Sequence, residues 1–562
     1  MPHLRSVWIA PLVVLAVGLA CENPLRVENS NEPDRNRALS SPADVEALIG
    51  ASYATVHQGT LGGISLVAQL QTMGLENYST LANFNMGPRG AVPRSAIIND
   101  RGNPGQDIHF RDFTFMHRAA WAAAQGYARL NIPGFTLGSA GRDARARAFA
   151  RFAHGAALGN LALAYDSGGH VTENDVEGTV PPLLGYNDLR DAALGYLDEA
   201  IAIAQANGSG FPLPANWMNG NPLSRDDFVR LVRSYKARFR AGVARTPAER
   251  AAVGWAAVIA DAENGIQSDF QIEMNSVAGW QMAWVGQHFV SANWHQMWQF
   301  MLGMADTSGA YSAWLNTAPG DRVPFVVVTP DRRFPQGVDR PTQQANSPRG
   351  ALTGEAAPPV DATPYFRNRP SGEDQPGDPI GISMYDFWRT RLLFNTANQA
   401  GVRWSVMTKA EMDLLRAEGL VRTGAGNIPA ALALIDVSRV GKGQLPSLVA
   451  AGITDTLTAV PGGSACVPKV PDPATSFKSA KCGNIMEALK WEYRMETAFT
   501  GYGMWYFAGR GWGDLPEGTA YHWPVPYQEM DARREPFYDL GGVGGPASLG
   551  RGTYGLFSGG VF

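Results

Sequence analysis

The sequence predicts a mainly α-helical protein, a scaffold of paired helices interrupted by one irregular, loop-rich region that carries the ligand face. Apolar residues recur at three- and four-residue spacing in segments toward both ends of the chain, which is typical of amphipathic helices. Between these segments, residues 271–402 are rich in Gly, Pro and Trp and show little periodicity. The chain has 562 residues, so at least two sub-regions or one large helical assembly are expected.

The N-terminus has the pattern of an export signal. A short positive start precedes an apolar run, Val7–Ala20, which is too short and too early for a mature membrane-spanning helix. Ala20 directly precedes Cys21, as in the processing site of bacterial lipoproteins. Either residues 1–20 are a signal peptide and Cys21 is lipidated, or ordinary cleavage near Ala20 releases a soluble protein.

A polar stretch separates this signal from the folded body. Residues 21–42 are predicted to be the lipidated cysteine and an extended tether. A helix then begins with Ser41 as its N-cap and Pro42 in its first turn. Further helices are predicted over 143–166, 187–206, 225–244, 248–267, 405–422, 428–440 and 484–500.

The faces of these helices are rich in Ala and punctuated by Tyr and Phe, so antiparallel pairs can approach closely. Such pairs resemble tetratricopeptide-like units, although their spacing is not a regular repeat. The chain is therefore divided into an N-terminal helical region (43–270), a loop-rich ligand-binding region (271–402) and a C-terminal helical region (403–562).

Aromatic residues concentrate at 280–314, where Gln and Asn alternate with the rings. Flat rings stack on the C–H faces of sugars while amides bond hydroxyl groups, so this composition suits a carbohydrate site. The alternative is that each ring belongs to the core, since several lie four residues apart on possible helices. The candidate ligand-binding tryptophans are Trp280, Trp284, Trp294, Trp298 and Trp314.

The polar segment 76–89 is the second candidate for the ligand face. Tyr78, Asn83 and Asn85 combine a ring with amides, as a sugar site would require. An ordinary surface loop explains the same residues equally well.

Cysteine usage agrees with export. Apart from Cys21, the chain has only Cys466 and Cys482, which flank a Pro- and Lys-containing loop. An even pair in an oxidising compartment predicts a disulfide. A zinc site is disfavoured because neither cysteine has Cys or His neighbours at metal-ligand spacing.

No motif for catalysis or a cofactor was found. The sequence lacks a zinc-protease helix motif, a nucleophile elbow and a phosphate loop, and His288 and His295 lack a third ligand nearby. Asn174–Glu177 only weakly suggests a structural calcium ion, and no cofactor is expected. The net charge of −4 offers no basic field, so nucleic acid is disfavoured as a partner and none is expected.

Motifs in the C-terminal third carry a family resemblance. In order along the chain they are Ala417-Glu418, Ala430–Leu432, Ile435–Arg439, Trp491–Glu496, Phe499–Arg510 and His522–Met530. This series resembles the signature segments of the SusD/RagB family of nutrient-binding lipoproteins. Asp436 stands where the family has asparagine, and Tyr493 separates a Glu and an Arg that are usually adjacent. The charged residues Glu492, Arg494, Glu496 and Arg510 are expected to be structural.

The resemblance implies a non-enzymatic, lipid-anchored protein at the cell surface of the outer membrane. It would bind glycans or other oligomers and deliver them to a TonB-dependent transporter of the SusC type. Two alternatives stand beside this hypothesis. One is a helical scaffold that closes a transporter without touching substrate, and the other is a secreted glycan hydrolase.

Overall fold

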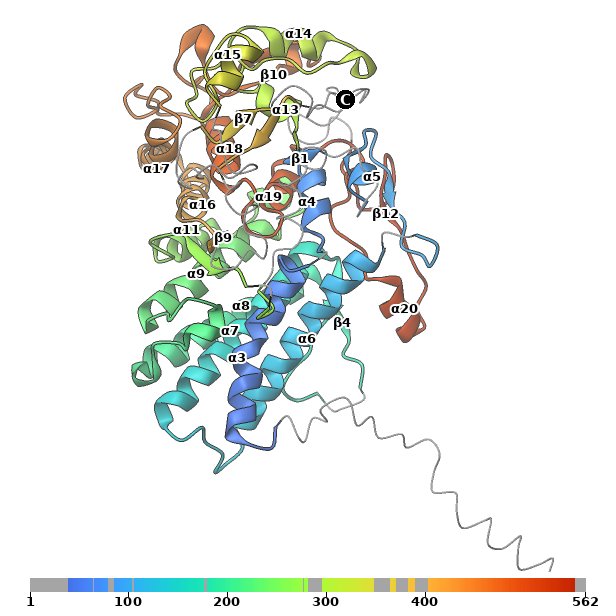
Figure 1. Cartoon of the computed structure of the whole chain (residues 1–562), viewed down its shortest axis with the longest axis vertical. Coiled ribbons are helices and arrows are strands. Elements are labelled where there is room, and N and C mark those ends of the chain that lie inside the picture. Colours follow the sequence, from blue (N-terminus) through green and yellow to red (C-terminus); the bar gives the residue numbers. More distant parts are fainter. Residues whose placement is uncertain are drawn as a thin grey trace, which may run out of the picture.

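A computed structural model describes residues 39–63, 65–78, 85–103, 106–175, 179–275, 277–280, 296–347, 364–369, 383–389 and 403–550. The described chain is mainly helical, as the sequence predicted (Figure 1). The signal peptide, Cys21 and the tether up to residue 38 lie outside the described residues. Among the described residues, no helix combines the length and apolarity needed to cross a membrane.

Long helices near the N-terminus form one layer, in which α7 packs against α3, α6 and α8. The first helix begins as predicted, because Ser41 Oγ accepts a hydrogen bond from the Asp44 amide (3.2 Å) and Pro42 occupies the first turn. The helices of this region are α3 (Pro42–Thr60), α4 (Val67–Met73), α5 (Met86–Gly90), α6 (Gln106–Leu130), α7 (Ala140–Ala164), α8 (Tyr186–Ala206), α9 (Arg225–Gly242), α10 (Pro247–Ala251) and α11 (Trp255–Glu263).

The later helices pack directly on this layer. Helix α16 lies against α9 and α11 on one side and against α17 and α18 on the other (Figure 1). Buried residues of both helical regions therefore form one continuous hydrophobic cluster. These elements are α13 (Gln299–Gly303), α14 (Ala310–Asn316), α15 (Arg340–Ala345), α16 (Lys409–Arg422), α17 (Ile428–Gly441), α18 (Ile485–Thr497), α19 (Met504–Trp512) and α20 (Tyr527–Arg533).

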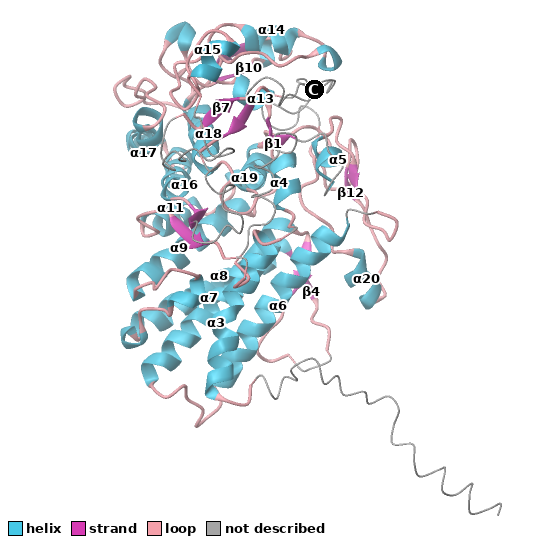
Figure 2. Ribbon diagram, in the orientation of Figure 1, coloured by secondary structure: helices cyan, strands magenta, loops and turns pink. Residues whose placement is uncertain are grey.

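Strands in the described chain are short and pair only in twos (Figure 2). The pairs are β1 (Asn77–Tyr78) with β6 (Gln296–Met297), β2 (Ala96–Ile97) with β12 (Leu540–Gly541), β3 (Ser167–Gly169) with β4 (Leu183–Gly185), β5 (Phe270–Glu273) with β9 (Arg403–Met407), β7 (Phe366–Asn368) with β8 (Tyr385–Phe387), and β10 (Lys469–Pro471) with β11 (Ala480–Cys482).

Two predicted helices differ from the structure. The segment 248–267 contains two helices, α10 and α11, because the chain turns at Ala252–Gly254 between them. The segment 405–422 begins as strand β9, and the helix starts only after the N-cap Thr408. Residues 403–407 are extended because they pair with β5, a partner more than a hundred residues away that local periodicity cannot reveal.

Buried ion pairs join the two helical regions. Arg250 of α10 contacts Glu418 of α16 at 2.6 Å, and both side chains are almost completely buried. Arg238 of α9 pairs with Glu411 of α16 at the same distance. Burial alone would raise the pKa of Glu418, but the cations of Arg250 and Arg422 outweigh it and lower that pKa to about 2. Glu418 of the motif Ala417-Glu418 thus has a structural role.

Candidate ligand-binding region

The two segments that the sequence singled out as ligand candidates meet in the structure. Strand β1 of segment 76–89 runs antiparallel to β6 of segment 280–314, with Asn77 opposite Met297 and Tyr78 opposite Gln296. The indole Nε1 of Trp298 donates to the Asn77 carbonyl oxygen (3.0 Å). Its ring meets the Tyr78 ring edge-to-face, with centroids 4.7 Å apart. The sequence analysis identified both segments but did not predict that they pair.

Three of the candidate tryptophans are core residues, and this corrects their assignment to the ligand face. Trp280, Trp298 and Trp314 are 3%, 2% and 5% exposed. Trp280 packs on Tyr53 and His57 of α3, with ring centroids 6.3 and 5.2 Å away. Rings enclosed by neighbouring helices cannot stack on a sugar, so the alternative that these tryptophans pack the core holds for all three.

Trp314 shows the same behaviour in another part of the core. Its ring lies against Phe300, Tyr311 and Phe325, with centroids 6.3 to 6.4 Å apart. The guanidinium of Arg322 covers it at 4.4 Å from the ring centroid. This tryptophan therefore stabilises the packing of α13, α14 and the chain that follows them.

Of the remaining candidates, the structure describes Tyr78 and Asn85. Tyr78 is only 8% exposed, so its ring supports the sheet and is not a ligand platform. Asn85 is partly exposed and adopts the left-handed conformation (φ 58°) before α5, which asparagine tolerates better than most residues. Trp284, Trp294 and Asn83 lie outside the described residues, as do His288 and His295.

A buried carboxyl group ties β1 to the C-terminal motif. The amide of Phe499 donates a hydrogen bond to Glu76 Oε1. Burial raises the pKa of Glu76 to about 8, although this hydrogen bond acts in the opposite direction. The group is therefore mostly protonated at neutral pH and adds little charge beneath the paired strands.

The charged motif residues are structural, as predicted. Arg333 is fully buried and contacts Asp331 at 2.7 Å and Glu492 at 2.6 Å. Glu496 pairs with Arg389 at 2.9 Å and accepts a hydrogen bond from Ser438 (2.7 Å). Every charge in this cluster has an opposite partner, which burial requires.

Arg494 and Arg510, the other two charged motif residues, are also buried with partners. Arg494 pairs with Asp514 at 2.6 Å. Arg510 donates to the carbonyl oxygens of Leu163 (2.8 Å) and Gly242 (3.0 Å), at the ends of α7 and α9. A guanidinium at these carbonyls satisfies groups that a helix leaves unpaired at its C-terminus.

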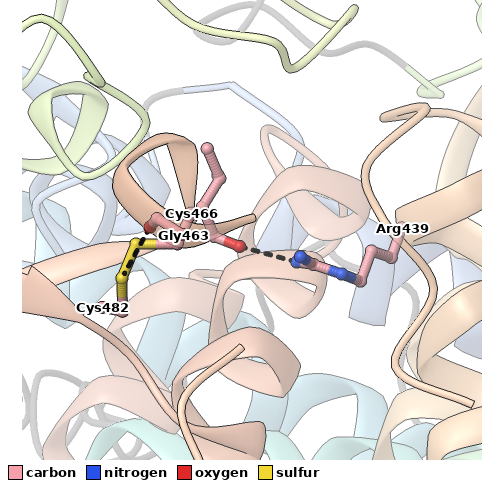
Figure 3. The surroundings of a disulfide bond; sticks show 5 residues. Arg439, Gly463, Cys466 and Cys482 are labelled. Carbon is pink, nitrogen blue, oxygen red and sulfur yellow. Dashed lines mark hydrogen bonds between the residues drawn. A yellow bond between two sulfur atoms is a disulfide. The ribbon is translucent and has the colours of Figure 1, made fainter. Parts of the chain in front are cut away.

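The predicted disulfide is present. Cys466 and Cys482 are bonded, with Cα atoms 5.8 Å apart, and close the β10–β11 hairpin. Nearby, Arg439 of the family motif donates to the Val467 carbonyl oxygen at 2.7 Å (Figure 3). Asp436 binds the Leu448 amide at 3.0 Å and thereby shapes the turn after α17. This hairpin and this turn are parts of the scaffold.

Sequence reasoning missed one surface residue. Within the described ranges, Trp121 of α6 is the one tryptophan that is not buried, with 40% of its surface exposed. Arg111 and Arg118 of the same helix lie over the Phe115 ring, at 4.5 and 5.7 Å from its centroid. Helix α6 was not predicted, so its outward face could not be recognised from the pattern.

Among the described residues, no group of three or more His, Cys, Asp or Glu side chains is placed to hold a metal ion. Asp175, part of the suggested calcium loop, instead accepts hydrogen bonds from the Thr172 amide (2.8 Å) and hydroxyl (2.9 Å). These bonds close a local turn. Residues 176–178 lie outside the described chain.

No family model matches the chain, and no curated protein matches it. Among solved structures, similarity extends over most of the chain at low identity. Surface glycan-binding protein A from Bacteroides uniformis has a TM-score of 0.48 and 11% identity, covering 88% of this chain and 98% of its own. A SusD superfamily protein from Parabacteroides distasonis has a TM-score of 0.47 and 11% identity, with 88% and 97% covered.

A SusD-like carbohydrate-binding protein from Bacteroides fragilis has a TM-score of 0.45 and 13% identity, and the match covers 91% of this chain and 95% of that one. Six of eight similar solved structures carry the SusD superfamily or SusD-like name, and the proteins from Parabacteroides distasonis and Bacteroides fragilis are among the six.

Proposed function

We propose that this chain is a SusD/RagB-type binding protein of the cell surface that captures oligosaccharide without cleaving it. The observation that carries the proposal is the pairing of β1 with β6, which joins two segments rich in rings and amides on one helical frame. Tyr78 is the last residue of β1, and its partner Gln296 is the first of β6. Tyr78 and Gln296, the described residues next to the two candidate segments, therefore lie at the same end of this sheet.

Under this proposal, Asn83, Trp284 and Trp294 contact the ligand, and the buried Trp298 supports them. Ring stacking and amide hydrogen bonds give affinity without a titrating nucleophile. The C-terminal motif series supports the proposal through its resemblance to this family. Its charged residues tie α18 to the chain around Arg333, Arg389 and Asp514.

The proposed location and partner follow from the same family. Cys21 would carry the lipid that anchors the protein to the outer membrane, and residues 22–42 would be its tether. The captured oligosaccharide would pass to a SusC-like TonB-dependent transporter. A Cys21→Ser variant should then appear in the soluble fraction, whereas the unchanged protein stays with the membrane.

Ligand binding is tested with the mature protein and a panel of oligosaccharides in isothermal titration calorimetry. Trp284→Ala and Trp294→Ala should each weaken binding about tenfold, if a sugar ring gains from one aromatic ring about what a nucleobase gains, roughly 1–3 kcal/mol. Their unfolding temperatures should stay close to that of the unchanged protein.

Trp298→Ala serves as the core control and should lower the unfolding temperature. If Trp284→Ala and Trp294→Ala unfold the protein in the same way, these rings are core residues and the proposed site is wrong. A protein that binds no oligosaccharide but co-purifies with a barrel transporter would favour the scaffold alternative.

A further inference from the structure

A cavity of about 330 Å³ lies between the start of α8, the end of α9 and the turn from α10 to α11. Its lining residues, within 187–254, belong to other elements than β1 and β6. Asn187, Arg190 and Asp191 line it from α8, and Arg240 lines it from α9. Small-molecule sites begin at about this size, roughly 300 Å³, so the cavity can hold a single sugar ring.

Arg240, which lines the cavity from α9, belongs to a cluster of cations around one carboxylate. The carboxylate of Asp261 is shared by three cations, Arg233 (3.3 Å), Lys236 (3.4 Å) and Arg240 (3.1 Å). Lys236 has a second carboxylate, Asp198, at 2.6 Å. Arg240 therefore shares the Asp261 carboxylate with two other cations, so this carboxylate neutralises Arg240 only in part. Asp191 and Glu249 balance charge elsewhere in the lining, and an incoming anion would bind at Arg240 itself.

Donor groups remain available on both walls. Arg240 uses only its Nε in binding Asp261, and its two terminal nitrogens have no hydrogen-bond partner among the described residues. Across the cavity, Arg190 binds Asp191 through Nε (2.9 Å) and Asn187 through Nη1 (2.8 Å), which leaves Nη2. Paired guanidinium nitrogens bind a carboxylate with two parallel hydrogen bonds.

The same cavity also offers acceptors and an apolar surface. Glu249 is held in place because its carboxylate accepts from the Tyr186 hydroxyl (3.1 Å) and the Arg245 amide (2.8 Å). Its remaining lone pairs, like those of Asp191, can accept bonds from hydroxyl groups. Leu194 and Val253 add aliphatic contact area. A simple inorganic anion would use only the cationic part of this lining.

We propose that this cavity is a subsite for an acidic sugar, a hexuronic acid residue. Its carboxylate would lie between Arg190 and Arg240, and its hydroxyl groups would donate to Asp191 and Glu249. The inference extends the proposed function by naming a ligand class, and it places that ligand at a site separate from the β1–β6 sheet.

Two variants test the cavity without touching the core. Gly254 lines it, has an ordinary φ of −67°, and an added Cβ would meet no atom within 4 Å. Gly254→Leu therefore fills the space without strain. Arg240→Gln removes the cation, and Arg225→Gln, which lies on the same helix in an exposed pair with Asp226, is the matched control.

The probes are glucuronate and galacturonate, with glucose and galactose as neutral counterparts. Their binding is measured by saturation-transfer NMR and calorimetry. Both uronates should bind about tenfold more tightly than the neutral sugars, and raised salt should weaken them. Gly254→Leu and Arg240→Gln should each lose about tenfold in uronate affinity, whereas Arg225→Gln should keep it.

The proposal is overturned if neither uronate binds, if neutral sugars bind equally well, or if Gly254→Leu leaves uronate binding intact. Its failure is distinct from failure of the proposed function. Oligosaccharide binding that depends on Trp284 would persist in Gly254→Leu, whereas uronate binding at the cavity would persist in Trp284→Ala.

Discussion

The buried pair of Arg250 and Glu418 should be a main connection between the two helical regions. Replacing Glu418 by Gln leaves Arg250 buried without its counter-charge. The Arg250 guanidinium makes two contacts with Glu418, Nε to Oε1 at 3.0 Å and Nη2 to Oε2 at 2.6 Å. Breaking one partner of such a pair costs about 3–5 kcal/mol of unfolding free energy.

The pKa of Glu418 gives an independent magnitude. It falls from 4.5 to about 2 in the folded protein, because the pairs with Arg250 and Arg422 outweigh burial. At about 1.4 kcal/mol per pKa unit, this shift corresponds to roughly 3 kcal/mol of stability. Because the folded pKa is depressed, this stability is fully present above about pH 4.5 and is lost as the pH falls toward 2.

The assay is urea unfolding of the unchanged protein and of Glu418→Gln between pH 3 and 7, with tryptophan fluorescence as the signal. The variant should be less stable by about 3 kcal/mol at pH 7, and the difference should shrink as the pH falls below 4.5. Glu263→Gln is the control, since Glu263 pairs with Arg416 in an exposed position and should cost under about 1 kcal/mol. Equal effects of the two variants, or a difference that does not change with pH, would refute the reasoning.

Three further outcomes are expected. In the same urea assay, Glu76→Gln should become more stable relative to the unchanged protein as the pH rises from 4.5 to 8. The raised pKa of Glu76 makes the unchanged protein lose stability over that range. A stability difference that does not change with pH would contradict this expectation. Removing the disulfide with a Cys466→Ser/Cys482→Ser double variant should lower the unfolding free energy by about 3 kcal/mol, the value expected from loop entropy. Thermal unfolding measures this loss, with Ser464→Ala as the control. Equal unfolding temperatures of the double variant and the control would show that the bond is dispensable. Trp298→Ala should cost about 3–5 kcal/mol and Trp121→Ala under about 1 kcal/mol in thermal unfolding, and a reversed order would mean that burial has been misjudged.

Local sequence signals predicted the helical frame well. The Ser41-Pro42 start follows from a helix cap, and the long helices α7, α8 and α9 follow from apolar spacing. Both signals act within a few residues. The break between α10 and α11 and the strand β9 could not be predicted in the same way. Strand β9 depends on a distant partner, β5, and only the folded chain brings the two together.

The sequence could predict which segments form the candidate site, but it could not predict which of their residues are exposed. Ring and amide composition marked 76–89 and 280–314, and the structure joins them through β1 and β6. The same composition could not separate Trp298, which packs on Tyr78, from a ring that faces solvent. Burial depends on which elements cover a side chain, and α3 and β1 come from elsewhere in the sequence.

The central claim is that the helical frame binds an oligosaccharide without changing it. It is tested most directly by giving the mature protein an oligosaccharide from the panel. Calorimetry measures the affinity, and chromatography follows the length of the sugar over a day of incubation. The account predicts saturable binding with the oligosaccharide recovered whole. Shortened products that disappear when a single carboxylate is replaced, or no binding to any oligosaccharide of the panel, would contradict it.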